Sequence, residues 1–379
     1  MSSTGRIHIE PLQTLLDRDL DYVCENLRDE FSKMAGQRVL MTGGAGFLGY
    51  YMVQSVLHWN DHRASAGDKI HMTVFDNYVR GVPVWLESLK GRKDLTLTRF
   101  DIRDPLPNPM PELEYIIHAA GIASPTYYRA YPLETMDANI DGLRRLLEYA
   151  RARRDAGRAF NGFIFYSSSE IYGDPAPDMV PTPEDYRGNV SCTGPRACYD
   201  ESKRYGETLC VVFAKYYNVP VRIVRPFNNY GPGLKISDRR VIPDFARDVM
   251  AGRDITMLSD GKPMRTFCYV ADAVVGYYKA LVRGRAGEPY NIGVDRPEIS
   301  MKDLAGRVVA TARELFDYSG RVVMQSSTEN DYLVDNPNRR CPDMTKSNTE
   351  LDYHPTILVD EGLRRSLTWY HYHREAVDA

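Results

Sequence analysis

Residues 37–59 read QRVLMTGGAGFLGYYMVQSVLHW, and the pattern of this stretch predicts the type of fold. The apolar run that ends at Met41 predicts a short buried strand, and the apolar run after the glycines predicts a helix. Between them, Gly43, Gly46 and Gly49 form a G-x-x-G-x-x-G pattern. Such glycines allow a tight turn and a close backbone approach to a pyrophosphate, while the helix N-terminus offers N–H groups and a positive dipole end. The stretch therefore predicts a strand, a phosphate-binding loop and a helix in succession.

A carboxylate ends the next apolar strand, IHMTVFD, at Asp76. An acidic residue at this point of a dinucleotide-binding fold accepts hydrogen bonds from the adenosine ribose hydroxyls, which favours NAD. Arg80 follows closely, and an arginine there is able to accommodate the 2′-phosphate of NADP. The sequence therefore predicts NAD as the cofactor and leaves NADP open as the alternative.

Strand and helix patterns alternate along the next part of the chain. Further strands are predicted at LTLTRFD (95–101), YIIHAAG (115–121), GFIFYSS (162–168) and VRIVRPFN (221–228), with helices at 132–154 and 199–217. Strands that are apolar throughout and alternate with helices are typical of a parallel sheet covered on both faces. We therefore predict an α/β fold with a doubly wound Rossmann sheet over residues 37–226.

Two other segments flank this unit. After about Phe227, proline, glycine and charged residues become frequent, and helical stretches near 241–252, 271–283 and 300–315 alternate with short strands. We predict a smaller mixed α/β lobe over 227–379, with 270–285 returning to the Rossmann domain. Apolar residues at helical spacing in 10–34 predict a helical extension over 1–36. This extension either packs on the domain surface or serves as a dimer contact or an active-site cover.

The composition narrows the class of protein. The chain has 379 residues, a net charge of −3 and 43% hydrophobic residues, which gives no electrostatic case for nucleic acid or an anionic membrane as a partner. There is no apolar run of membrane-spanning length and no signal-peptide core. The six cysteines show no C-x-x-C pairing, so we expect no metal and no disulfide. We expect a cytoplasmic protein with reduced thiols.

A serine, a tyrosine and a lysine form the candidate catalytic group. Ser168 lies at the carboxyl end of a predicted strand, where ligands bind in open α/β sheets. Tyr199 and Lys203 are four residues apart, on one face of a helix. A lysine cation near the phenol favours phenolate, so we expect the pKa of Tyr199 to be lowered toward neutrality. The phenolate then takes a proton from a substrate hydroxyl as hydride leaves, and Ser168 hydrogen-bonds the same hydroxyl.

With these residues in place, the chain resembles the extended short-chain dehydrogenases/reductases that act on nucleotide sugars. The motifs that carry the resemblance are TGGAGFLG, HAAG, SSSEIYG, YDESK and RPFNNYGPG, within roughly residues 37–370. The resemblance implies a Rossmann domain with a C-terminal nucleotide-sugar lobe, NAD as cofactor and a homodimer formed through a helix bundle. The predicted cofactor contacts are Gly43, Gly46, Phe47, Leu48, Gly49, Asp76, Asn77, Asp101, Ile102, Ala119, Tyr199 and Lys203.

The tripeptide Ser168-Ser169-Glu170 separates the branches of this family. The 4,6-dehydratases carry Thr-Asp-Glu there, and the 4-epimerases usually carry a small residue and no glutamate. The UDP-glucuronate decarboxylases, or UDP-xylose synthases, carry a Ser/Thr-Ser-Glu arrangement and resemble this chain most closely. ASPTYY, GPRACYDESKR and GYYKAL also resemble that branch, although Ser202 stands where its members usually carry glycine. The implied reaction is oxidation at carbon 4 of UDP-glucuronate, decarboxylation and re-reduction to UDP-xylose.

The resemblance also implies roles for residues that contact the sugar nucleotide. Glu170 is expected to handle a proton or orient a sugar hydroxyl, and Arg265 to hold the substrate's carboxylate or diphosphate. The predicted substrate contacts are Ser124, Ser169, Asn228, Arg240 and Arg265. A UDP-apiose/xylose synthase, a 4-epimerase, a 4,6-dehydratase or a 4-dehydrogenase remains as an alternative. A non-catalytic NAD-binding regulator is disfavoured, because Ser168, Tyr199 and Lys203 are all intact.

Overall fold

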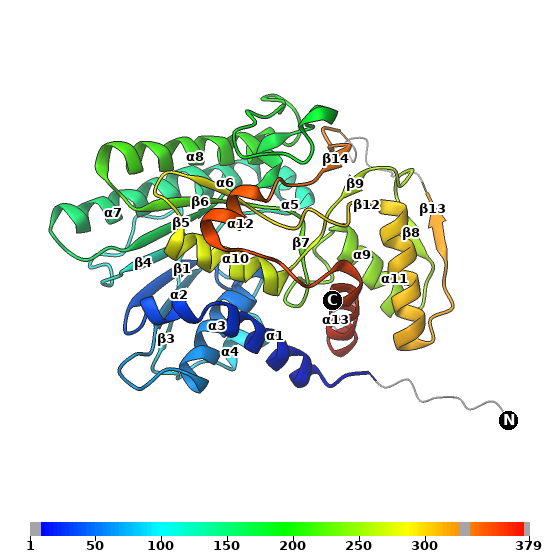
Figure 1. The fold of residues 1–379 in the computed structure, drawn as a ribbon, viewed down its shortest axis with the longest axis horizontal. Helices are drawn as coiled ribbons and strands as arrows, with labels where there is room; N and C mark the ends of the chain where they lie inside the picture. The colour runs from blue at the N-terminus through cyan, green and yellow to red at the C-terminus, as the bar shows by residue number, and fades with distance from the viewer. Residues whose placement is uncertain (1–8, 326–333, 375–379) are drawn as a thin grey trace.

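The computed structural model describes residues 9–325 and 334–374 and has a seven-stranded sheet at its centre (Figure 1). The strands are β1 (Arg38–Thr42), β2 (His71–Asp76), β3 (Leu95–Arg99), β4 (Tyr115–His118), β5 (Gly162–Tyr166), β6 (Val221–Pro226) and β11 (Pro289–Ile292). They lie in the order β11-β6-β5-β4-β1-β2-β3, and every neighbouring pair is parallel. The predicted doubly wound sheet is confirmed. Its strand order reverses between β1 and β4, the point at which such sheets bind ligands.

Helices cover both faces of the sheet. The helices of this unit are α2 (Arg28–Lys33), α3 (Phe47–His62), α4 (Val84–Glu87), α5 (Pro125–Ala130), α6 (Pro132–Asp137), α7 (Leu143–Asp155), α8 (Ala197–Tyr217) and α10 (Val270–Arg283). Helices α7 and α8 lie on one side of the sheet, and α3 and α10 lie on the other (Figure 1). Leu40 of β1 is buried in the same cluster as Leu146 of α7, while Val39 and Met41 are buried in the same cluster as Val53 of α3. Alternate residues of one strand thus enter opposite cores, which explains why the strands are apolar throughout.

The remaining elements build a smaller lobe beside the sheet (Figure 1). Its strands are β7 (Asn229–Tyr230), β8 (Ile255–Met257), β9 (Met264–Arg265), β10 (Cys268–Tyr269), β12 (Ile299–Ser300), β13 (Val322–Met324) and β14 (Arg339–Arg340). Its helices are α9 (Val241–Met250), α11 (Met301–Phe316) and α13 (Val359–Tyr372). Helix α10 packs against the central strands β5 and β6. Two elements outside the predicted return, β11 and α12 (Thr345–Leu351), also join the Rossmann unit.

The N-terminal helix α1 (Leu12–Asn26) packs against α3, α10 and α13. Its Asp19 is fully buried and accepts hydrogen bonds from the Tyr51 hydroxyl at 2.6 Å and the Tyr269 hydroxyl at 2.5 Å. Arg365 of α13 donates to the other oxygen of Asp19 at 2.5 Å. These contacts of α1 join the Rossmann unit to the last helix.

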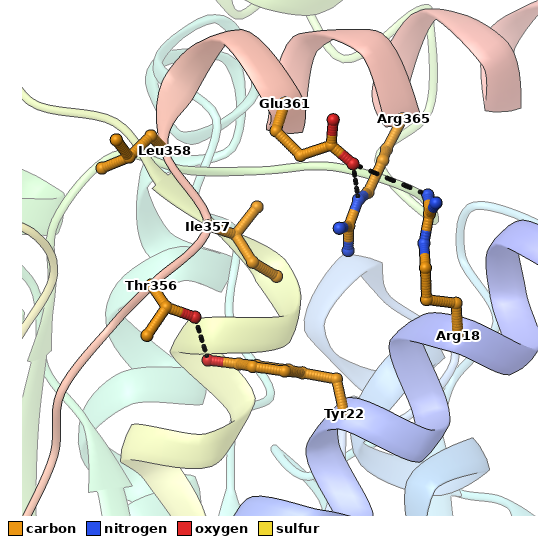
Figure 2. Close-up of a pocket in the computed structure, with 7 residues that line it drawn as sticks. All are labelled: Arg18, Tyr22, Thr356, Ile357, Leu358, Glu361 and Arg365. Atoms are coloured by element: carbon orange, nitrogen blue, oxygen red, sulfur yellow. Dashed lines mark hydrogen bonds and ion pairs between the residues drawn. The ribbon is translucent and has the colours of Figure 1, made fainter.

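A shallow hollow of about 390 Å³ lies between α1 and α13 (Figure 2). Figure 2 shows Glu361 between Arg365 and Arg18, with oxygen–nitrogen distances of 2.7 Å and 3.7 Å. The hollow is lined by Arg18, Tyr22, Thr356, Ile357, Leu358, Glu361 and Arg365. These lining residues include none of the predicted site residues. No helix in residues 9–325 or 334–374 has the length and apolar character needed to cross a membrane.

Replacing Asp19 by asparagine is expected to lower the free energy of unfolding by about 1.5–3 kcal/mol, the range for a hydrogen bond to a charged group. The reason is that Arg365 would face a neutral amide in a buried site. Urea denaturation measures the change. Asp21→Asn is the control, because the Asp21 side chain is 62% exposed and pairs only with His58 on the surface, so its effect should stay within about 0.5 kcal/mol. Equal effects for the two variants would contradict the role given to Asp19.

Candidate functional site

The glycine loop between β1 and α3 has no room for side chains at its key positions. Gly43 has a φ of +74°, and a Cβ there would lie 2.8 Å from the backbone of Ala120. A Cβ at Gly49 would lie 2.1 Å from the carbonyl oxygen of Gly44. Gly46 precedes the first turn of α3, so the N–H groups of that turn face the loop. The backbone therefore forms the cradle that a dinucleotide pyrophosphate requires, and the residues fit NAD.

The ends of β2 and β3 supply the expected carboxylates beside this loop. Asp76 accepts hydrogen bonds from the Ala45 N–H at 3.0 Å and the Tyr78 N–H at 2.8 Å. Asn77 donates to Asp101 at 3.1 Å. Burial raises the pKa of Asp76, while its backbone N–H partners oppose that shift. Asp76 is thus fixed at the carboxyl edge of the sheet, next to the glycine loop, where it suits the ribose.

The other predicted cofactor contacts fall along the same edge. Phe47 and Leu48 begin α3, Ala119 follows β4, and Ile102 is buried beside Gly142. These placements agree with their assignment, which remains a prediction.

Arg80 is engaged elsewhere than at the ribose. Its guanidinium pairs with Asp238 at 3.0 Å and lies 5.1 Å from the centroid of the Tyr127 ring. Arg80 shares Asp238 with Arg240, and this pairing holds its guanidinium toward the smaller lobe. This geometry favours NAD over NADP.

Ser168, Tyr199 and Lys203 come together beyond the end of β5. Ser168 caps the short 3₁₀ helix η2 (Ser169–Tyr172), and its Oγ accepts from the Glu170 N–H at 3.1 Å. Tyr199 and Lys203 lie on α8, and both side chains are buried. The Lys203 Nζ donates to the Tyr166 carbonyl at 2.8 Å and lies 5.6 Å from the centroid of the Tyr199 ring. The predicted group is therefore assembled from the end of one strand and one face of one helix.

The ionisation of this group differs from the expectation. Burial raises the pKa of Tyr199 to about 12, although a hydrogen bond from Ser168 opposes the shift. Burial also lowers the pKa of Lys203 to about 7. In the protein without cofactor the direction is thus the opposite of the expected one, because desolvation dominates the pKa of both groups. The lowering of the Tyr199 pKa by Lys203 remains a prediction.

A π turn, η1 (Ala138–Gly142), interrupts the helix formed by α6 and α7 and supports α8. Within it, Asn139 is buried and donates to the Ser202 Oγ at 2.9 Å. Ser202 in turn donates to the Tyr199 carbonyl at 2.9 Å. The serine that departs from the family pattern therefore links Asn139 to the turn that carries Tyr199. π turns are frequent at functional sites.

Glu170 lies between two arginines. Its Oε2 accepts a short hydrogen bond from Arg196 and a second from Arg340 at 2.6 Å. All three side chains are at most 16% exposed. The two cations hold the pKa of Glu170 well below its usual range, against the opposite effect of burial. Glu170 is thus an ionised acceptor, which makes it a positioning group rather than a proton donor near neutral pH.

Several polar atoms around this cluster lack partners. Among the described residues, buried side-chain atoms without a hydrogen bond include Asp200 Oδ1, Arg196 Nε, Arg340 Nε and the Tyr128 hydroxyl. The Tyr128 ring stacks on the Tyr199 ring at a centroid distance of 4.9 Å. Burial and the charge of Glu170 raise the pKa of Asp200 to about 7. Unsatisfied buried polar groups in one place are what a polar ligand site leaves open.

Arg265, predicted to hold the substrate, is buried among backbone carbonyls. It donates to the carbonyls of Met264 at 2.7 Å and Pro337 at 2.5 Å, and to the Asn336 Oδ1 at 3.2 Å. Burial lowers its pKa to about 9. The guanidinium therefore anchors the segment that leads into Arg340, and its direct contact with substrate remains a prediction.

The other predicted substrate contacts are distributed around the site. Arg240 pairs with Asp238 at 2.5 Å, and Ser124 donates to the Asp238 carbonyl at 2.8 Å. Asn228 donates to the Thr266 carbonyl at 2.8 Å. Ser169 is buried in η2. Their contacts with a substrate remain predictions.

Two residues of the cluster were absent from the sequence-based assignment. Arg196 lies within GPRACYDESKR, three residues before Tyr199, so its position in a recognised stretch was an available signal. Arg340 lies far along the chain beside Arg339, and only the pairing of β14 with β9 brings it to the site. No spacing rule in a single sequence predicts such a contact.

The comparisons with known proteins agree with this geometry. Residues 39–293 match the NAD dependent epimerase/dehydratase family. UDP-glucuronic acid decarboxylase 5 from Arabidopsis thaliana is 34% identical over 337 residues, covering 89% of this chain and 90% of that protein. UDP-glucuronic acid decarboxylase 1 from Xenopus tropicalis is 32% identical over 342 residues, covering 90% of this chain and 73% of that protein.

A solved structure extends the comparison to the fold. A dTDP-glucose 4,6-dehydratase from Streptomyces venezuelae, solved with NAD bound, is similar with a TM-score of 0.74 at 26% identity. The similarity covers 89% of this chain and 98% of that chain. The Rossmann unit and the smaller lobe are therefore shared with an enzyme of a different reaction, so fold alone does not fix the chemistry.

Proposed function

We propose a function for this chain on the basis of its family. The chain belongs to the NAD-dependent epimerase/dehydratase family. Its cofactor is NAD, and the glycine loop and Asp76 are the residues that would hold it. The function we infer is the oxidation of UDP-glucuronate at carbon 4, followed by decarboxylation and re-reduction to UDP-xylose. Relatives named UDP-glucuronic acid decarboxylase, which match about nine tenths of the chain, support this assignment.

The observation that carries the proposal is the cluster of Glu170, Arg196 and Arg340 beside Tyr199. Two guanidinium groups face the Glu170 carboxylate, and the Arg196 Nε also lies 4.0 Å from Asp200, whose pKa is raised to about 7 by burial and by Glu170. The cluster therefore carries an excess positive charge when Asp200 is protonated. Arginine's planar fork suits a carboxylate, and the unpartnered Nε groups offer further donors. A sugar acid bound next to Tyr199 would satisfy these groups, whereas a neutral hexose would leave the charge unbalanced.

The first step removes hydrogen from carbon 4. NAD, which the glycine loop and Asp76 would hold, would supply the hydride acceptor for this step and the hydride for the later reduction, and its positive charge would favour the phenolate form of Tyr199. Tyr199 takes the proton of the 4-hydroxyl, and the Ser168 hydroxyl hydrogen-bonds the same oxygen. Lys203 is held by the Tyr166 carbonyl close to the Tyr199 ring, where its ammonium form stabilises the phenolate.

The second step breaks the bond between carbons 5 and 6. The carboxylate is then β to the 4-ketone, so CO₂ leaves as the bonding electrons flow to the carbonyl oxygen. Tyr199 and Ser168 hydrogen-bond the enolate oxygen that forms. A proton is added at carbon 5, hydride returns to carbon 4, and the alkoxide regains its proton from Tyr199. The net reaction consumes one proton and releases one CO₂.

Ser169 distinguishes this reaction from dehydration. Water elimination across carbons 5 and 6 needs an acid, and an unperturbed serine hydroxyl is too weak an acid for that role. The buried Ser169 and the ionised Glu170 therefore disfavour a 4,6-dehydratase. Decarboxylation needs no acid at that position.

We expect the purified protein to convert UDP-glucuronate into UDP-xylose with release of CO₂, and to form no 4-keto-6-deoxy sugar from UDP-glucose or dTDP-glucose. NMR of the products over time, with ¹³C at carbon 6 of the glucuronate, measures both outcomes. A rapid 4-keto-6-deoxy product without CO₂ would overturn the decarboxylase assignment and leave the family assignment intact. A branched pentose product would instead identify ring contraction after decarboxylation.

We also propose that two copies of the chain associate through α6 and α8. The two helices pack together, and their exposed apolar side chains include Leu133 at 69%, Tyr205 at 48% and Val211 at 43%. An apolar patch of this kind suits an interface between copies. Tyr205→Glu should convert a dimer into a monomer in light scattering after gel filtration, whereas Tyr372→Glu, on α13, should not. A wild-type monomer would contradict the proposal.

The cysteines support a reducing compartment. All six are unpaired, and four of them are buried. We infer the cytoplasm as the place of action, because unpaired thiols persist where glutathione and thioredoxin keep them reduced.

A further inference from the structure

One loop of the smaller lobe, residues 235–240, contacts three segments at the carboxyl edge of the Rossmann sheet. These segments follow β1, β2 and β4, and they surround the site where the cofactor binds. We propose that this loop, which we call the strap, retains NAD between turnovers. Asp238 is the residue that holds the strap against the loop after β2. The inference concerns the cofactor and holds whichever sugar is turned over.

Asp238 makes the central contact of the strap. Its side chain is 3% exposed, and each carboxylate oxygen takes one arginine. Oδ2 accepts from Arg80, on the loop after β2, at 3.0 Å, and Oδ1 accepts from Arg240, on the strap's own end, at 2.5 Å. Charge-assisted hydrogen bonds are among the stronger polar contacts in a protein, and here the carboxylate is buried while the two arginines are 43% and 33% exposed. Asp238 therefore joins the two sides of the cofactor site.

Arg80 has two further ties to the strap's surroundings. Its carbonyl accepts from the Lys235 Nζ at 2.6 Å. Its guanidinium lies 5.1 Å from the Tyr127 ring centroid, within cation–π range. The loop after β2 is thus bound to the strap by both its backbone and its side chain.

The segment after β4 adds a second attachment. The Ser124 Oγ donates to the Asp238 carbonyl at 2.8 Å, and the Tyr127 hydroxyl donates to the Ser237 carbonyl at 3.3 Å. On the third side, the Arg240 guanidinium lies 5.7 Å from the ring centroid of Phe47, the first residue after the glycine loop. The strap therefore spans from Asp76's loop to the start of α3.

These contacts predict slow cofactor release. A dinucleotide held by the glycine loop and Asp76 would leave only after the strap separates from the loop after β2. That separation requires the Asp238–Arg80 pair to break. The proposed reaction returns its hydride within one cycle, so it needs no exchange of cofactor and is compatible with such retention.

The experiment measures the dissociation rate of NADH directly, without sugar substrate. The protein is loaded with NADH and mixed with excess NAD, and the loss of bound-NADH fluorescence gives the rate. Asp238→Asn and Arg80→Met should each raise this rate roughly tenfold or more, because each removes a charged hydrogen bond. The double variant should be no faster than Asp238→Asn alone, because both changes break the same contact.

The control is Asp248→Asn. Asp248 is a buried aspartate of α9 that accepts from Arg253 at 3.1 Å and from the Thr256 N–H at 3.1 Å, so it matches Asp238 in type but lies outside the strap. Its NADH dissociation rate should equal that of the wild type. Arg80 is 43% exposed, so Arg80→Met provides the test even if Asp238→Asn fails to fold. An NADH dissociation rate within twofold of wild type in Arg80→Met, or an equal acceleration in Asp248→Asn, would contradict the proposal that the Asp238–Arg80 pair slows cofactor release.

Discussion

Replacing Tyr199 by phenylalanine is expected to lower kcat for CO₂ release from UDP-glucuronate by about 10²–10⁴-fold, the range for loss of a general base. Phenylalanine keeps the ring that stacks on Tyr128 at 4.9 Å, so the buried packing survives. What is lost is the hydroxyl that Ser168 hydrogen-bonds and that, in the proposed mechanism, accepts the proton of the 4-hydroxyl. NADH absorbance in a single turnover, together with CO₂ release, measures the effect on the first step.

The matched control is Tyr166→Phe. Tyr166 is also a buried tyrosine near the site, but its hydroxyl makes only a 3.7 Å contact with the Met52 sulfur, and Lys203 uses its backbone carbonyl. This variant should keep kcat within a few-fold of wild type. UDP affinity by calorimetry should be unchanged in both variants. Near-normal turnover by Tyr199→Phe would mean that Tyr199 is structural and that the proposed mechanism is wrong.

The parts of the fold that follow local rules could be predicted from the sequence. The glycine pattern, the strand ending in Asp76 and the spacing of Tyr199 and Lys203 each depend on residues close together in the chain. A parallel sheet then brings the carboxyl ends of its strands to one edge, so Asp76 and Ser168 had to share that edge. The resemblance to the family then indicated which role each of these local segments has in cofactor binding or in the reaction.

Contacts between segments far apart in the chain could not be predicted in the same way. Asp238 of the smaller lobe pairs with Arg80 of the Rossmann unit, and this ion pair depends on how the strap lies over the loop after β2. The pKa of Tyr199 is also a property of the assembled site, because burial raises it and outweighs the opposite effect of the Ser168 hydrogen bond. A motif indicates which side chains lie close together, but it does not show how strongly they are desolvated in the folded protein.

Arg265 shows that the sequence can indicate a functional residue type without indicating which contacts that residue makes. The sequence predicted a substrate-binding arginine at this position, and in the structure Arg265 donates to the backbone carbonyls of Pro337 and Asn338. Its contact with substrate remains a prediction. The neighbour that reaches Glu170 is Arg340. Arg340 is therefore a further candidate for the substrate-binding arginine that the sequence predicted at Arg265.

Arg340→Ala is expected to lower the rate of CO₂ release by about 10²–10³-fold, comparable to removing one preorganised donor from an active site. Arg340 donates to Glu170 at 2.6 Å, and its Nε, like that of Arg196, has no hydrogen-bond partner among the described residues, so it is able to meet a second carboxylate. Its loss would leave Arg196 as the remaining partner of Glu170 and lower the positive charge of the cluster by one. The initial rate of ¹³CO₂ release from UDP-glucuronate labelled at carbon 6 measures the effect.

The adjacent residue gives the sharpest control for this prediction. Arg339 is also on β14, but it is 40% exposed and pairs with Glu298 at 2.7 Å. Arg339→Ala removes the same side chain one position away, and because a strand points successive residues to opposite faces, it should leave CO₂ release within about threefold of wild type. Arg340→Lys should recover only part of the loss, since a lysine keeps the charge but not the planar fork that reaches two acceptors. If Arg339→Ala and Arg340→Ala reduce the rate equally, the effect comes from the stability of β14, and the cluster is not the carboxylate site.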